Sequence, residues 1–170
     1  MPSHSANGIE IVADPAVASH IHGQEQWYGK DAVDGFLNRD SLVPWQLLSD
    51  VLASTYGAEV QLSDGTELEA GSALKKFCIL RIYVTTTNVN SKTFKIQFWT
   101  GLTTFAEVVL HTEFLFRSAS ANERSAPIDL TSPTDFCNRK IWARMMCEDV
   151  GGKTLDFLFA VHTYDAPVIT

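Results

Sequence analysis

A histidine pair near the N-terminus has the residue type and spacing closest to a metal site in this sequence. His20 and His22 stand on either side of Ile21. In an extended chain, residues two apart point to the same side, which is the geometry that two ligands of one metal ion need. No third His, Cys or carboxylate accompanies the pair at a fixed spacing. We therefore interpret the pair as a polar loop or a contact with a neighbouring chain, and we expect no metal and no other cofactor.

Short catalytic motifs are missing from the sequence. It contains no GxSxG, no HExxH, no P-loop and no GxGxxG, the patterns that mark a nucleophile, a metal-bound water or a phosphate-binding loop. His111 lies between Glu107 and Glu113 on a polar strand face, where we expect it to be solvated. His162 follows the last apolar run, where a structural role is expected. The sequence therefore predicts that the protein is not an enzyme.

Tryptophan and arginine side chains within the apolar runs indicate contact surfaces. Trp99 and Trp142 fall out of phase with the other apolar residues of their strands and should point to the opposite face. An exposed tryptophan can stack on a sugar or become buried in a neighbouring subunit, and subunit burial is the commoner outcome. Arg144 lies in an apolar strand, so we expect a carboxylate partner at a sheet edge or an interface. The candidate interface residues are His20, His22, Trp27, Trp45, Trp99, Trp142 and Arg144.

The composition is that of one folded domain. The chain has 170 residues, of which 45% are hydrophobic and 19% are charged, and this excludes a long disordered or low-complexity protein. The formal charge of −7 argues against binding to nucleic acid through its phosphates. No apolar run approaches the roughly 18 residues of a membrane span. We expect neither nucleic acid nor a membrane as a partner.

The elements that must position these residues are β-strands. From residue 57 onward, apolar residues recur with a period of two, most regularly in 93–99, where Phe94, Ile96 and Phe98 share one face. No crossover helix separates the apolar runs, which argues against a parallel sheet. The sequence predicts an all-β fold, an antiparallel β-sandwich of jelly-roll type. The predicted strands are 58–62, 66–69, 76–86, 93–99, 107–117, 126–130, 141–147 and 154–161.

The first third of the chain is less regular. Residues 1–26 are rich in small and polar side chains and are predicted to form an extended N-terminal arm, which cannot bury enough surface to order itself alone. Residues 27–170 are predicted to form a single β-sandwich domain. Pro44, shortly after Asp40 and Ser41, favours one short helix that runs to about Ala53, the only helix predicted.

Several short stretches resemble a family of small virion proteins from tailed bacteriophages. The stretches are HIHG (20–23), WYGK (27–30), DSLVPWQ (40–46), GAEV (57–60), KIQFWTG (95–101), IWAR (141–144) and HTYD (162–165). The resemblance covers about residues 27–165 and is to jelly-roll decoration (cement) proteins, which sit on capsids, often as trimers. It implies a structural virion protein, assembled in the host cytoplasm, that binds the major capsid protein as a homotrimer and stabilises the shell. It brings no catalytic residue.

An alternative function remains open at this point. The same fold also serves phage tail and fibre-tip proteins that bind a receptor or a glycan, so the fold cannot decide between the two roles. The mark of the alternative would be Trp99, Trp142 or Tyr164 exposed around a shallow groove.

Overall fold

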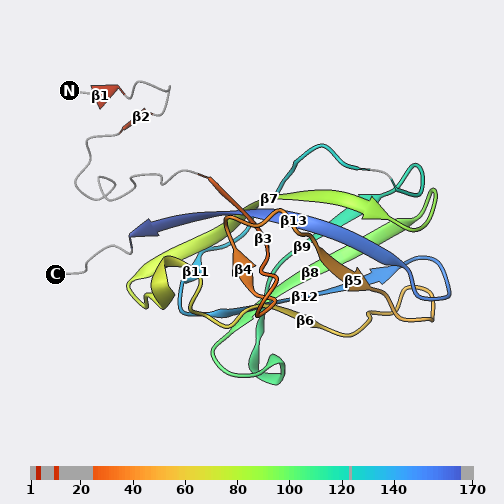
Figure 1. The fold of residues 1–170 in the computed structure, drawn as a ribbon, viewed down its shortest axis with the longest axis horizontal. Helices are drawn as coiled ribbons and strands as arrows, with labels where there is room; N and C mark the ends of the chain where they lie inside the picture. The colour runs from red at the N-terminus through yellow and green to blue at the C-terminus, as the bar shows by residue number, and fades with distance from the viewer. Residues whose placement is uncertain (1–2, 5–9, 12–24, 123, 166–170) are drawn as a thin grey trace.

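The computed structural model describes residues 3–4, 10–11, 25–122 and 124–165. His20 and His22, with most of the predicted arm, lie outside the described residues. The described part of the chain folds into two antiparallel β-sheets that pack face to face, with the sheet that contains β7 and β13 lying against the sheet that contains β8 and β12 (Figure 1). It contains no α-helix, and two 3₁₀ turns are the only helical elements described: η1 (Glu69–Gly71) and η2 (Phe105–Glu107).

The larger sheet has the strand order β10-β7-β13-β3-β4, with β11 also paired to β7 and β5 also paired to β13. Its strands are β3 (Gln26–Lys30), β4 (Leu37–Asn38), β5 (Trp45–Leu48), β7 (Lys75–Thr87), β10 (Ile128–Asp129), β11 (Asp135–Phe136) and β13 (Thr154–Asp165). The smaller sheet has the order β6-β12-β8-β9. Its strands are β6 (Val60–Ser63), β8 (Thr93–Gly101), β9 (Val109–Arg117) and β12 (Lys140–Cys147). Two further short strands, β1 (Ser3–His4) and β2 (Glu10–Ile11), pair with each other.

This connectivity is that of a jelly roll. In chain order, the principal strands are β3, β6, β7, β8, β9, β10, β12 and β13. The first, eighth, third and sixth of these lie side by side in one sheet, and the second, seventh, fourth and fifth lie side by side in the other. Apart from β8 and β9, the neighbours among these eight strands are distant in sequence, as in two interlocked Greek keys. The predicted all-β sandwich is confirmed.

Aromatic rings from both sheets form the centre of the core. The ring of Phe98 in β8 lies 5.6 Å from Phe159 and 5.8 Å from Phe157 of β13, measured between centroids. Trp45 of β5 packs on Phe159 at 5.3 Å and is only 1% exposed. Trp45 is therefore a core residue, and its prediction as an interface residue is wrong. The predicted alternation of 93–99 is confirmed, because Phe94, Ile96 and Phe98 are all fully buried.

The predicted short helix ending near Ala53 is also wrong. Trp45–Leu48 is instead strand β5, with Leu48 opposite Thr154 and Trp45 opposite Phe157 of β13. Its side chains alternate between buried and exposed, as a strand at a sheet surface requires. Pairing with a long neighbouring strand outweighs the weak local preference for a helical turn after Pro44.

Candidate functional site

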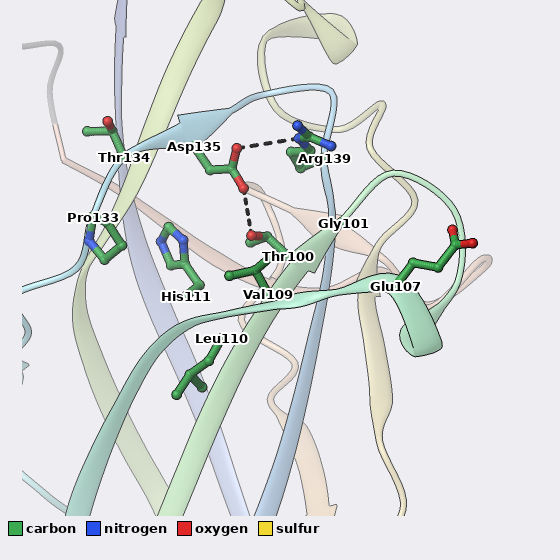
Figure 2. Close-up of a pocket in the computed structure, with 10 residues that line it drawn as sticks. All are labelled: Thr100, Gly101, Glu107, Val109, Leu110, His111, Pro133, Thr134, Asp135 and Arg139. Carbon is green, nitrogen blue, oxygen red and sulfur yellow. Dashed lines mark hydrogen bonds and ion pairs between the residues drawn. The ribbon is translucent and has the colours of Figure 1, made fainter.

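A pocket of about 370 Å³ opens where β8 ends and β9 begins (Figure 2). One wall comes from the end of β8, from η2 and from the start of β9, and the opposite wall comes from the segment that contains β11 and the turn that leads to β12. The lining residues are Thr100, Gly101, Glu107, Val109, Leu110, His111, Pro133, Thr134, Asp135 and Arg139. A pocket of this volume, with a few converging polar groups, has the size and character of a small-ligand site.

Asp135 is the central polar group of this pocket. The hydroxyl of Thr100 donates a hydrogen bond to Asp135 Oδ2 at 2.6 Å. The guanidinium Nε of Arg139 lies 3.4 Å from Asp135 Oδ1, an ion pair four residues apart along the chain (Figure 2). Thr100 comes from β8, so the hydrogen bond joins the two walls. Both charged side chains remain partly exposed, so they can contact a ligand as well as each other.

His111 enters the pocket wall because β9 carries an extra residue there. Thr112 pairs with Phe98 and Leu110 pairs with Trp99, so His111 lies in a β-bulge between them. A bulge redirects the side chain of its extra residue. His111 is 6% exposed, its ring stacks on Phe77 at 5.4 Å, and its Nε2 is buried without a hydrogen-bond partner among the described residues. The prediction that His111 is solvated is wrong, because the bulge could not be seen in the sequence.

The electrostatics of His111 follow from its burial. Loss of hydration lowers the pKa of His111 to about 4, and the nearby negative charge of Asp135 only partly opposes this effect. The imidazole is therefore neutral at physiological pH and does not carry a positive charge.

Two arrangements in the described residues place a hydroxyl or a thiol beside a titratable group. In the pocket, the hydroxyl of Thr100 donates to the carboxylate of Asp135, and His111 lines the same pocket. On the outer face of the larger sheet, His162 lies opposite Cys78 in the β7–β13 pairing. Burial, however, raises the pKa of the Cys78 thiol, and its sulfur accepts a hydrogen bond from the Tyr164 hydroxyl. A thiol held in its neutral form is inert.

Three predicted interface residues come together on the outer face of the smaller sheet. Trp99 of β8 lies directly opposite Trp142 of β12, and Arg144 is two residues further along β12. The guanidinium carbon of Arg144 lies 4.9 Å from the Trp99 ring centroid and 4.5 Å from that of Tyr56. Arg144 Nε donates to the Gln97 side-chain oxygen at 3.0 Å. Cation–π contacts and a neutral acceptor thus take the place of the expected carboxylate partner, which is not found among the described residues.

A turn of the chain closes this aromatic cluster. Phe105 in η2 lies 5.8 Å from Trp99 and 6.2 Å from Trp142, edge to face with both rings. Trp142 is only 4% exposed as a result. The two tryptophans therefore pack under their own loop and do not form the open stacking groove that would mark the glycan-binding alternative.

Trp27 lies in a different place, on the outer face of the larger sheet. It lines an apolar pocket of about 300 Å³ together with Leu42, Tyr83, Pro127 and Leu158. The predicted interface residues thus do not form one surface in the described part of the chain.

A group of exposed apolar side chains at one end of the sandwich was not predicted from the sequence. The loop after β5 and the loop between β12 and β13 meet there, since Gly151 N–H donates to the Val51 carbonyl at 2.8 Å. Four large apolar side chains at the end of β5 and on these loops are between 54% and 66% exposed, and we call them the loop-end patch: Leu48, Val51, Leu52 and Val150. Leu48, Val51 and Leu52 are spaced as on one face of a helix, but the chain forms no helix there, and Val150 joins them only through the contact between the two loops.

No protein-family model and no curated protein sequence matches this chain. No helix in the described part of the chain is long and apolar enough to span a membrane. The described residues also contain no group of three or more His, Cys, Asp and Glu side chains that could hold a metal ion.

Proposed function

We propose that this protein is a structural virion protein that decorates the capsid surface as a homo-oligomer and stabilises the shell. The observation that carries the proposal is the loop-end patch, in which the end of β5 and two loops that meet present four half- to two-thirds-exposed apolar side chains. Contiguous exposed apolar surface on a soluble domain is typical of a protein–protein contact. The sequence resemblance to phage decoration proteins supports the same role by analogy, and the jelly-roll fold is compatible with it.

The mechanism needs no chemistry. A protein that binds only the assembled shell shifts the assembly equilibrium toward the shell by mass action. Many symmetric copies on one particle add avidity, so that a modest contact at each position is enough. The major capsid protein is the partner under this proposal, and the virion is where the protein acts.

Co-sedimentation with purified capsids that lack this chain tests the proposal. The wild-type chain should pellet with the capsids, and the double variant Val51→Asp, Leu52→Asp should bind about tenfold more weakly, because two charges replace two exposed apolar contacts. Val33→Asp is the matched control, since Val33 is 96% exposed on a turn outside the patch. If the wild-type chain pellets no better than an unrelated acidic protein, the proposal is refuted.

A second candidate function, binding of a receptor glycan, is favoured by the pocket in Figure 2. A carboxylate and a guanidinium, both partly exposed, converge there beside the buried imidazole of His111, and sugar hydroxyls can donate to the carboxylate and accept from the guanidinium. A glycan array probed with the wild-type chain and with Asp135→Asn separates the two functions. Glycan binding lost in the variant, with capsid binding retained, would support the second function, whereas an array without any bound glycan would rule it out.

A further inference from the structure

Strand β9 is the one long sheet edge without a partner strand in the described structure. The strands that end the order of the larger sheet, β4 and β10, have two residues each, and β6 at one edge of the smaller sheet has four. β9, at the other edge of the smaller sheet, has nine and pairs only with β8. A long edge strand presents a row of backbone donors and acceptors that can pair with another chain.

The backbone groups that face this open edge can be identified from the register. Ser118 N–H donates to the Lys92 carbonyl, and this bond continues the β8–β9 register, in which Lys95 pairs with Leu115. Hydrogen-bonded and non-hydrogen-bonded pairs alternate along an antiparallel ladder. Residues 114 and 116 therefore bond to β8, and the N–H and C=O groups of residues 113, 115 and 117 point to the open edge.

The side chains of the same residues are exposed on the outer face. Leu115 is 65% exposed, while Glu113 and Arg117 on either side of it are also exposed. Phe114 and Phe116 between them point into the core. The edge thus carries a negative, an apolar and a positive side chain in order, symmetrically placed about Leu115.

We propose that β9 pairs with β9 of a second copy of this chain, antiparallel and about a two-fold axis at Leu115. In this register Leu115 lies opposite Leu115 of the partner subunit, and Glu113 lies opposite Arg117 of the partner subunit. The two-fold axis gives this opposite-charge pair twice, once on each side of Leu115, as an isologous interface requires. A two-fold axis at Glu113 or at Arg117 would place like charges opposite each other, which disfavours those registers.

The contacts that Glu113 and Arg117 already make within their own chain are compatible with the proposed pairing. Glu113 binds Lys95 Nζ at 2.9 Å and accepts from Gln97 at 3.0 Å. Arg117 lies 3.4 Å from Glu148. In the proposed register, each charge keeps its neighbour on its own chain and gains one of opposite sign across the axis. Two four-stranded sheets then become one continuous sheet of about eight strands, a size within the range of natural sheets.

This inference does not depend on capsid binding, because the pairing is a property of the free chain. It yields a dimer, whereas the sequence resemblance implied a trimer. A single edge-to-edge contact is small, so we expect dimerisation that depends on protein concentration.

Sedimentation of the full chain over a concentration series tests the interface. Leu115→Lys places two lysines opposite each other on the axis and should weaken dimerisation by about tenfold. Val109→Lys is the matched control, because Val109 is a 70% exposed aliphatic residue of the same strand outside the paired segment. A wild-type chain that stays monomeric at its highest soluble concentration overturns the proposal, and so does a dimer or trimer that Leu115→Lys leaves unchanged.

A charge-exchange experiment fixes the register. Arg117→Glu alone and Glu113→Arg alone each place like charges opposite each other in the homodimer, so each variant should dimerise about tenfold more weakly. An equimolar mixture of the two variants brings two glutamates on one chain against two arginines on the other and should restore dimerisation. Local disturbance within each chain cannot produce such a rescue. Failure of the mixture to associate, with both variants shown to be folded by circular dichroism, overturns the proposed register.

Discussion

Replacement of His111 by phenylalanine should remove a pH-dependent part of the stability. In the folded chain the imidazole is buried against Phe77 with its pKa lowered to about 4, whereas in the unfolded chain it titrates near 6.5. Between these two values the unfolded chain binds a proton that the folded chain does not. Stability is therefore fully present above about pH 6.5 and is lost as the pH falls toward 4.

The size of this effect follows from the difference between the two pKa values. Over the whole window it amounts to about 3 kcal/mol, of which about 2 kcal/mol is already lost at pH 5 relative to pH 8. His111→Phe keeps a ring on Phe77 and removes the titrating group together with the buried nitrogen that has no partner. At pH 8 the variant should be at least as stable as the wild type, since an unsatisfied buried polar atom is gone.

Urea unfolding followed by tryptophan fluorescence measures the difference. Between pH 8 and pH 5 the midpoint of the wild type should fall by about 1 M more than that of the variant, for a urea dependence of about 2 kcal/mol per molar. Surface carboxylates titrate in both proteins and cancel in the comparison. Equal pH dependence of the two midpoints would refute the argument that His111 is buried in its neutral form.

The remaining predictions concern the core, the aromatic cluster and the cysteines. Phe98→Ala removes a fully buried ring that touches both sheets, and it should lower the free energy of unfolding by about 3–5 kcal/mol in denaturant titrations. Phe105→Ala uncovers Trp99 and Trp142, so the tryptophan emission should shift to the red while the far-ultraviolet circular dichroism stays unchanged; an unshifted spectrum would contradict the covering role of Phe105. All three cysteines are buried with raised pKa values, so an aromatic disulfide reagent should label none in the native protein and three in urea; rapid labelling of the native protein would show that they are accessible.

The long strands could be predicted from the sequence because each has an apolar face in its own residue pattern. Strand β8 alternates apolar and polar residues over its first half, and that pattern has one interpretation whatever its neighbours are. In β7, Arg81 forms ion pairs with Asp129 and Glu25. The short strands β3, β4 and β5 were missed, because segments of two to five residues become strands only when β13 or each other supply the pairing.

The candidate sites depended on contacts between segments far apart in the chain. The sequence indicated correctly that Trp99 and Trp142 point away from the core, but only the register of β12 against β8 puts them opposite each other, and only the turn at Phe105 covers them. The pocket needed the bulge at His111 and the approach of Asp135 from another segment.

The amino-acid sequence by itself determined that the chain folds as antiparallel β-layers, because the two-residue period of apolar side chains is a local property that each strand carries alone. The tertiary structure decided which strands are neighbours, which histidine is buried away from solvent and which strand lies at an open sheet edge. Those outcomes depend on pairing between distant segments, and a one-residue shift in register would exchange the buried and exposed faces of a strand.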